Sequence, residues 1–113
     1  MKINDYKKLV KVKEKPRQEA ILDYLARRPG KYWRNNVGLA VFEGKKGKRF
    51  VRFGVNGQAD ITGIRDGRRI EIETKTDDNE LSLDQEMFRY MILSEGGLYF
   101  VARSVDDVIR EGF

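Results

Sequence analysis

Two acidic segments separated by a tight-turn dipeptide constrain the fold of this chain more than any other feature of its sequence. The segments are Gly57-Gln58-Ala59-Asp60-Ile61 and Ile70-Glu71-Ile72-Glu73-Thr74-Lys75. Successive side chains of a strand point to opposite faces, so Glu71, Glu73 and Lys75 share one face of the second segment. Asp66-Gly67, which lies between the segments, is a favoured hairpin-turn dipeptide. The pattern predicts an antiparallel pair of strands that brings Asp60 beside that charged face.

The absence of two residue types narrows the chemistry, because the chain contains neither cysteine nor histidine. Without cysteine there is no disulfide, no thiolate nucleophile and no cysteine-bound zinc. Without histidine the chain lacks the commonest general base near neutral pH and the commonest ligand of transition metals. Hydrolysis would therefore depend on carboxylates, lysine and an oxygen-ligated metal, for which Mg²⁺ or Mn²⁺ is the natural choice.

Asp60 and Glu73 are the best candidate metal ligands, since they occupy adjacent predicted strands and can point the same way. The backbone carbonyl of Thr74 is a further candidate ligand. Lys75 shares the face of Glu73, where its ammonium group could position an attacking hydroxide or screen developing negative charge. Glu71 competes with Glu73 for the ligand role. Alternating charge and isoleucine is equally typical of a solvent-facing strand with a cross-strand ion pair, and this alternative stays open.

Two helix-start residues have a structural and a functional interpretation each. Glu19 lies near the start of the first predicted helix, where it could face the sheet or act as an ordinary acidic residue favoured by the helix dipole. Gln85 follows Ser82 at capping-box spacing, so its amide could close back on the backbone of Ser82. If that helix packs beside the acidic strand, the same amide could touch a metal-bound water or a phosphate oxygen.

A polyanionic partner is favoured by the formal net charge of +5. The basic residues form clusters at Lys7–Arg17, around Arg27–Arg34, at Lys45–Arg52 and at Arg65–Arg69. Each cluster alone could be a solvated surface, and the Lys45–Arg52 turn could be either a DNA-gripping hairpin or a solvated loop. The candidate nucleic-acid contacts are Lys45, Lys46, Lys48, Arg49 and Arg17.

The chain of 113 residues is expected to form a single domain, with Met1–Lys15 as a loose basic arm. No stretch approaches the length of a membrane span, and no secretory segment is recognisable, so a cytoplasmic location is expected. The patterns predict a first helix that starts at Pro16 and stops before Pro29-Gly30, with Ala20, Ile21, Tyr24 and Leu25 buried. Strands follow at Tyr32–Asn35, Val37–Phe42, Arg49–Phe53, around Asp60 and at Arg68–Thr76, with Glu43–Lys48 as a turn.

The remaining predicted elements are a helix capped by Ser82, a strand at Leu98–Ala102 and a short helix that starts at Ser104. Met87, Phe88, Met91 and Ile92 form the predicted buried stripe of the middle helix. The order helix, strands, helix, strand, helix indicates a mixed α/β domain.

With these residues in place, the chain resembles the VRR-NUC family, the virus-type replication-repair nucleases of the PD-(D/E)XK superfamily. The resemblance extends from about Arg17 to Val108. Its marks are Arg17-Gln18-Glu19-Ala20, Gly57-Gln58-Ala59-Asp60-Ile61-Thr62-Gly63, Ile72-Glu73-Thr74-Lys75, Leu81-Ser82-Leu83-Asp84-Gln85 and Gly96-Gly97-Leu98-Tyr99-Phe100-Val101-Ala102. One departure is Ala59, which stands where the superfamily name has proline.

The resemblance implies a restriction-endonuclease-like α/β core, in which helices flank a central mixed sheet. It implies Mg²⁺ or Mn²⁺ at Glu19, Asp60 and Glu73, with Lys75 as the catalytic lysine and Gln85 as a supporting residue. Stand-alone members resemble phage and bacterial DNA-repair proteins that act as homodimers on branched DNA such as Holliday junctions. A DNA endonuclease in the cytoplasm of a bacterial or phage-infected cell is therefore expected. A non-catalytic nucleic-acid-binding module with the same fold, or a restriction-type nuclease, is the alternative.

Overall fold

The computed structural model describes residues 16–35, 38–76 and 79–113, and in the segments 36–42 and 49–53 no side chain is described. The arm predicted at Met1–Lys15 lies outside the described residues. A first helix occupies residues 16–25. It is followed by β1 (Lys31–Arg34), β2 (Gly38–Gly44), β3 (Gly47–Phe53), β4 (Ile61–Arg65), β5 (Arg68–Thr74), α2 (Leu83–Ser94), β6 (Leu98–Ala102) and α3 (Val105–Arg110). The predicted order of elements is confirmed, and the chain is a mixed α/β domain.

The central sheet has four strands in the order β1-β4-β5-β6. β1, β4 and β5 pair antiparallel, whereas β6 runs parallel to β5. Asp66 and Gly67 connect β4 to β5 with φ values of 53° and 75°. Positive φ at both central residues matches the right-handed twist of the flanking strands, so the predicted hairpin is confirmed.

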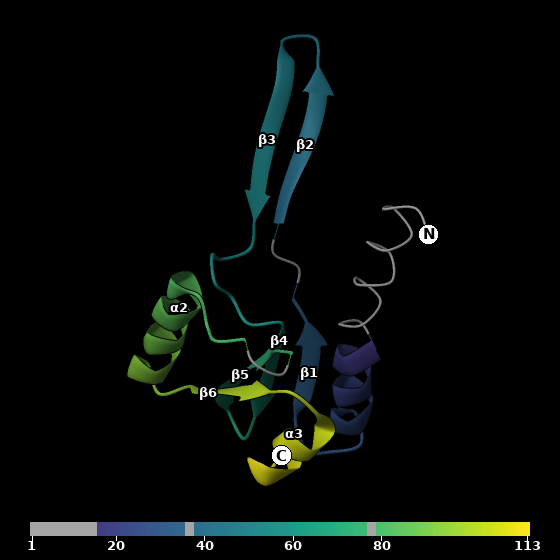
Figure 1. Ribbon diagram of the computed structural model, residues 1–113, viewed down its shortest axis with the longest axis vertical. Helices are drawn as coiled ribbons and strands as arrows, with labels where there is room; N and C mark the ends of the chain where they lie inside the picture. Colours follow the sequence, from purple (N-terminus) through teal and green to yellow (C-terminus); the bar gives the residue numbers. More distant parts are fainter. Residues whose placement is uncertain (1–15, 36–37, 77–78) are drawn as a thin grey trace.

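Helices flank this sheet (Figure 1). On one face, Ile61, Ile70 and Ile72 belong to the main core, which the first helix completes with Ile21 and Leu25. On the other face, α2 packs Phe88 and Ile92 around Tyr99 of β6. The alternation of β5 therefore sends its isoleucines into the main core and sends Glu71 and Glu73 to the α2 side.

None of the helices in the described part of the chain combines the length and apolar character that a membrane span requires.

The predicted stripes of the two longer helices are partly wrong. Ala20 is exposed, and in α2 only Phe88 and Ile92 are buried, whereas Met87 is 63% exposed. The reason is that α2 packs mainly on β6. The sheet therefore covers only part of the apolar surface of the helix. Exposed apolar side chains on α2, here called its outer face, are Leu83, Met87, Tyr90, Met91 and Leu93.

A long hairpin of β2 and β3 projects from this body (Figure 1). Its turn is only Lys45-Lys46, shorter than the predicted Glu43–Lys48, because β2 and β3 stay paired out to Gly44 and Gly47. Gly47 has a φ of 109°, which a residue with a side chain rarely adopts.

The N-terminus of α2 is held by its cap and by close packing against Gly57. The backbone N–H of Gln85 donates to the hydroxyl of Ser82 (3.2 Å), and the Ser82 N–H donates to Gln85 Oε1 (2.9 Å). A Cβ added to Gly57, whose φ is 76°, would lie 2.1 Å from the carbonyl oxygen of Asp84. Only glycine lets the chain before Asp60 approach α2 this closely.

Substitution of Gly57 should therefore cost more than backbone strain alone. Gly96→Ala introduces alanine at a φ of 87° with nothing within 4 Å, so it should cost about 1–2 kcal/mol of unfolding free energy. Gly57→Ala adds a clash with backbone, and we expect a further loss of roughly 1–3 kcal/mol. Urea denaturation of both variants measures the difference, and equal losses would contradict this packing.

Candidate active site

Asp60 is fixed at the start of β4 by the last residue of β5. Its Oδ2 accepts hydrogen bonds from the backbone N–H of Thr74 (2.9 Å) and from the Thr74 hydroxyl (2.6 Å). Its backbone carbonyl accepts from the N–H of Asn35 (2.8 Å), just beyond β1. Hydrogen bonds in which one partner is charged are stronger than those between neutral groups. The two donors of Thr74 therefore fix the orientation of the Asp60 side chain.

The first turn of the first helix docks on the same point of the sheet. Gln18 Nε2 donates to the hydroxyl of Thr74 (3.1 Å), and Arg17 Nη1 donates to the carbonyl of Lys75 (2.9 Å). One nitrogen of Arg17 is therefore engaged inside the fold. Its predicted contact with nucleic acid stays a prediction.

Glu73 is buried, and one of its carboxyl oxygens lacks a partner in the described part of the chain. It is only 4% exposed. Its Oε1 accepts a hydrogen bond from Gln85 Nε2 (3.1 Å), but within the described residues its Oε2 has no hydrogen-bond partner. The oxygen of Gln85 closes the helix cap, as the first interpretation predicted, and its nitrogen holds Glu73. The predicted contact of this amide with a metal-bound water or a phosphate oxygen stays a prediction.

Burial, together with the nearby negative charge of Asp60, raises the pKa of Glu73 from 4.5 to about 8. The Lys75 ammonium opposes this shift. These effects show that Asp60 and Lys75 both lie near the Glu73 carboxyl group. Two neighbouring carboxylates, one of them with an oxygen that has no partner among the described residues, are costly for a fold unless one takes up a proton or a cation joins them.

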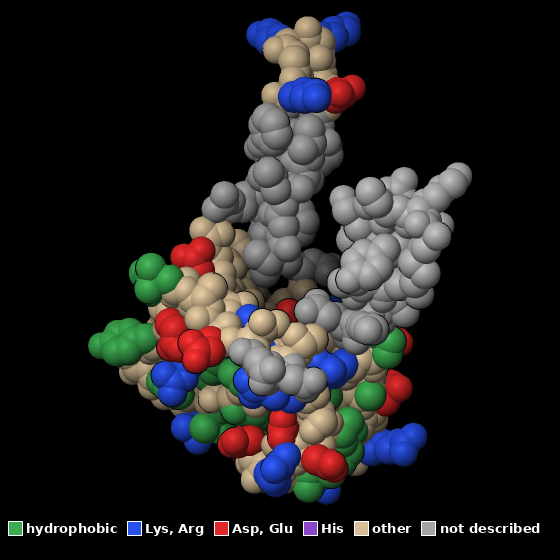
Figure 2. Space-filling view, in the orientation of Figure 1, with side chains coloured by type: hydrophobic (Ala, Val, Ile, Leu, Met, Phe, Trp, Pro, Cys, Tyr) green, Lys and Arg blue, Asp and Glu red, His purple; other side chains and the backbone are tan. Residues whose placement is uncertain are grey.

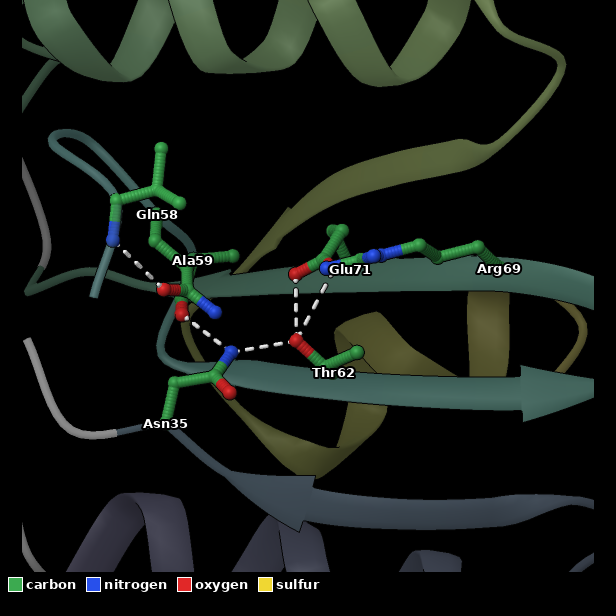
Figure 3. A network of polar contacts seen from close by, with 7 residues as sticks. Asn35, Gln58, Ala59, Thr62, Arg69 and Glu71 are labelled. Carbon is green, nitrogen blue, oxygen red and sulfur yellow. Dashed lines mark hydrogen bonds and ion pairs between the residues drawn. The ribbon is translucent and has the colours of Figure 1, made fainter.

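Glu71 occupies a different environment from Glu73, although both lie on the same face of β5. Its side chain is fully buried, and its oxygens accept from the Thr62 hydroxyl (2.9 and 3.0 Å) and from Arg69 Nε (2.7 Å), as Figure 3 shows. Burial raises the pKa of Glu71, while the hydrogen bonds from Arg69 and Thr62 lower it. The carboxylate of Glu71 is thus already engaged, which favours Glu73 over Glu71 as the ligand.

The polar contact of Glu19 is with a different group from those of Asp60 and Glu73. Its side chain is 63% exposed, and it forms an ion pair with Arg34 at 3.9 Å. Across residues 16–35, 38–76 and 79–113, no three acidic, histidine or cysteine side chains come together in a way that could hold a metal ion. The predicted role of Glu19 as a ligand stays a prediction.

Asp60 and Glu73 nevertheless fit a divalent cation. Mg²⁺ is usually held by one or two carboxylates, while water and substrate phosphates complete its octahedron. Once deprotonated, the buried Oε2 of Glu73, which has no partner in the described part of the chain, would supply the hard anionic donor that such a cation prefers. The backbone carbonyl of Thr74, at the end of β5, remains a predicted additional ligand.

Tyr99 is a neighbour of this site that sequence reasoning missed. Its hydroxyl is buried and, among the described residues, without a hydrogen-bond partner. Burial raises the pKa of this hydroxyl, and the charges of Glu73 and Asp60 raise it further. Strand alternation in the apolar segment Leu98–Ala102 was the available signal, because it puts Tyr99 on the face of Glu71 and Glu73.

The predicted basic contacts lie elsewhere. Lys45, Lys46 and Lys48 are exposed at the tip of the β2–β3 hairpin, where Figure 2 shows Lys and Arg side chains projecting. The backbone of Arg49 is in β3, and its side chain lies outside the described residues. In comparisons with known proteins, no family model and no curated protein matches the chain.

The raised pKa of Glu73 predicts how stability depends on pH in the absence of metal. A carboxyl whose pKa is higher in the folded state contributes stability that is complete below about 4.5 and is lost as pH rises through about 8. We expect Glu73→Gln to flatten this decline by up to about 1.4 kcal/mol per pH unit within that window. Urea denaturation in EDTA from pH 5 to 8 measures the slope.

The control for this experiment is Glu80→Gln, at an exposed position, which should leave the slope unchanged. Buried Glu71 contributes in the same direction as Glu73 and is common to all three proteins. Parallel curves for wild type and Glu73→Gln would contradict the assigned environment of Glu73.

Proposed function

We propose that the protein is a metal-dependent endonuclease with a VRR-NUC-type PD-(D/E)XK core. The observation that carries this proposal is the buried Glu73 Oε2, which lies beside Asp60 and has no partner among the described residues. Gln85 binds the other oxygen of Glu73, and Lys75 is close enough to lower the pKa of Glu73. An ordinary solvent-facing strand would expose these carboxylates and pair them with surface cations. The burial of Glu73 favours a site that is completed by a ligand.

The residues divide the work of phosphodiester hydrolysis among them. Asp60 and Glu73 would hold Mg²⁺ or Mn²⁺, which supplies Lewis-acid stabilisation of the phosphate oxygens and acidifies water. Thr74 keeps Asp60 in one orientation, and Gln85 does the same for Glu73. Lys75 provides a positive charge where negative charge develops on the phosphate.

The proposed substrate is structured or branched DNA, such as a four-way junction. A domain of this size makes few base contacts, so its affinity would rest on phosphates. The exposed Lys45, Lys46 and Lys48 extend its positive charge along the projecting hairpin. Recognition by shape rather than by base sequence follows from such contacts.

A homodimer would place two such sites on two strands of a junction. Its candidate interface is the outer face of α2, where Figure 2 shows hydrophobic side chains at the surface. Leu83, Met87 and Tyr90 follow helical spacing along this face and are all exposed. Contiguous apolar surfaces of this kind usually mark interaction sites.

Introduction of a charge on that face should separate the two copies. Met87→Glu would bury an unpaired carboxylate at the interface, so we expect a monomer that retains its fold and loses paired cleavage of junctions. Sedimentation velocity measures the mass. The matched control, Ile109→Glu, changes an exposed isoleucine of α3 and should leave the dimer intact. A monomeric wild type would refute this part of the proposal.

The direct test of the activity is a panel of labelled DNAs with Mg²⁺, Mn²⁺ or EDTA. The panel comprises linear duplex, single strand, flap and four-way junction. We expect cleavage with either metal, strongest on the junction, and none in EDTA. Lys75→Ala should bind DNA about as tightly as wild type and lose at least about a hundredfold in rate, because it removes charge stabilisation of the transition state.

The two glutamates of β5 provide the matched comparison. Glu73→Gln should abolish metal-supported cleavage, whereas Glu71→Gln should retain it. Cleavage that persists in EDTA would exclude the metal mechanism. Binding of junctions without cleavage in any metal would instead identify a non-catalytic nucleic-acid-binding module.

A further inference from the structure

A small pocket opens beside the candidate active site, on the same side of the sheet as Glu71. Its volume is about 170 Å³, and it is lined by Trp33, Asn35, Gln58, Thr62, Ile64 and Arg69. Pockets for drug-sized ligands are larger, roughly 300–1,000 Å³, so this one suits a single flat group. Its position is fixed by the site, because Thr62 lies two residues after Asp60 in the chain and the Asn35 N–H donates to the Asp60 carbonyl.

The apolar walls of the pocket come from β1 and β4. Trp33 is 45% exposed and Ile64 is 50% exposed, although both lie on strands of the central sheet. The register pairs Trp33 with Thr62, so the indole stands on the face that carries the pocket. An exposed indole offers a flat surface on which bases of any identity can stack.

The polar wall is held in place by hydrogen bonds drawn in Figure 3. Asn35 Nδ2 donates to the carbonyl of Ala59 (3.0 Å) and to the hydroxyl of Thr62 (2.5 Å). Both amide hydrogens are thereby used, which leaves the Asn35 oxygen as an acceptor. Gln58 has the opposite arrangement, because its Oε1 accepts from the N–H of Val55 (3.2 Å) and its Nε2 remains a donor.

Glu71 holds the polar wall in place through hydrogen bonds from inside the fold. Its carboxylate binds Thr62, which orients Asn35, and it binds Arg69 through Nε. The terminal nitrogens of the half-exposed Arg69 stay available to a phosphate. Since Glu71 is fully buried, its own carboxylate is withheld from the pocket opening.

We propose that this pocket binds one unpaired nucleobase of the substrate next to the phosphodiester at Asp60 and Glu73. The base stacks on Trp33, its edge hydrogen-bonds to Asn35 and Gln58, and Arg69 contacts the adjoining phosphate. A donor and an acceptor side by side match the complementary edges of bases, and unpaired bases are the ones that can be splayed onto aromatic side chains. The inference rests on the proposed function for its nucleic-acid substrate. It adds that one base near the cut must be unpaired or must leave its partner at the branch point of a junction.

The test uses Trp33 itself, because it is the only tryptophan of the chain. The protein in EDTA is titrated with a short oligothymidylate and, separately, with an abasic oligomer of equal length and equal phosphate charge. We expect the oligothymidylate to quench the fluorescence of Trp33 and the abasic oligomer to leave it nearly unchanged. Equal quenching by both oligomers, or none by either, would overturn the proposal.

Variants extend the test to affinity, measured by the fluorescence anisotropy of labelled oligomers. Trp33→Ala should weaken binding of the oligothymidylate about tenfold or more and leave binding of the abasic oligomer unchanged. Gln58→Ala should act in the same direction if Trp33→Ala fails to fold. The matched control is Tyr90→Ala, which removes an exposed aromatic ring from α2 and should change neither affinity. Equal losses with both oligomers would overturn the pocket.

Cleavage assays separate this inference from the proposed function. Base-dependent quenching without cleavage in any metal would refute the nuclease and support the pocket. Metal-dependent cleavage combined with base-independent binding would support the nuclease and refute the pocket.

Discussion

The hydrogen bonds from Thr74 to Asp60 are the contact on which the rest of the site depends. They join the start of β4 to the end of β5. The hydroxyl of the same threonine also accepts a hydrogen bond from Gln18 of the first helix. Three segments that lie far apart in the sequence therefore meet at one side chain. Loss of this contact would release Asp60 from Glu73, and the first helix would lose an anchor on the sheet.

The same region stores unfavourable electrostatics. Asp60 and Glu73 repel each other, Glu73 is desolvated, and neither Glu73 Oε2 nor the Tyr99 hydroxyl finds a partner in the described part of the chain. Folding tolerates these terms because the opposite face of β5 buries Ile70 and Ile72 in the main core. Natural proteins commonly accept such local costs where a ligand will later relieve them.

Local patterns in the sequence were sufficient for the central hairpin and for part of the site. Strand alternation, together with the Asp66-Gly67 turn, correctly put Asp60 beside Glu73, and capping-box spacing correctly started α2 at Ser82. Long-range packing was not accessible in this way. Helical periodicity marked Met87 and Met91 as buried, but it cannot report how little of α2 the sheet covers. The neighbours of Trp33 depend on the register between β1 and β4, which are separated by the whole β2–β3 hairpin.

The hairpin that separates β1 from β4 also holds its tip at a fixed distance from the central sheet. Each of its strands has seven residues, so its tip stands about 23 Å beyond its base at roughly 3.3 Å per residue. Along a duplex that length corresponds to roughly seven base-pair steps of 3.4 Å. If the protein is the proposed nuclease and the lysines of the hairpin contact the phosphate backbone, the number of paired residues in β2 and β3 sets the spacing between the contacted and the reacting phosphates. Insertion or removal of a residue pair would then move the site of incision along the strand in discrete steps.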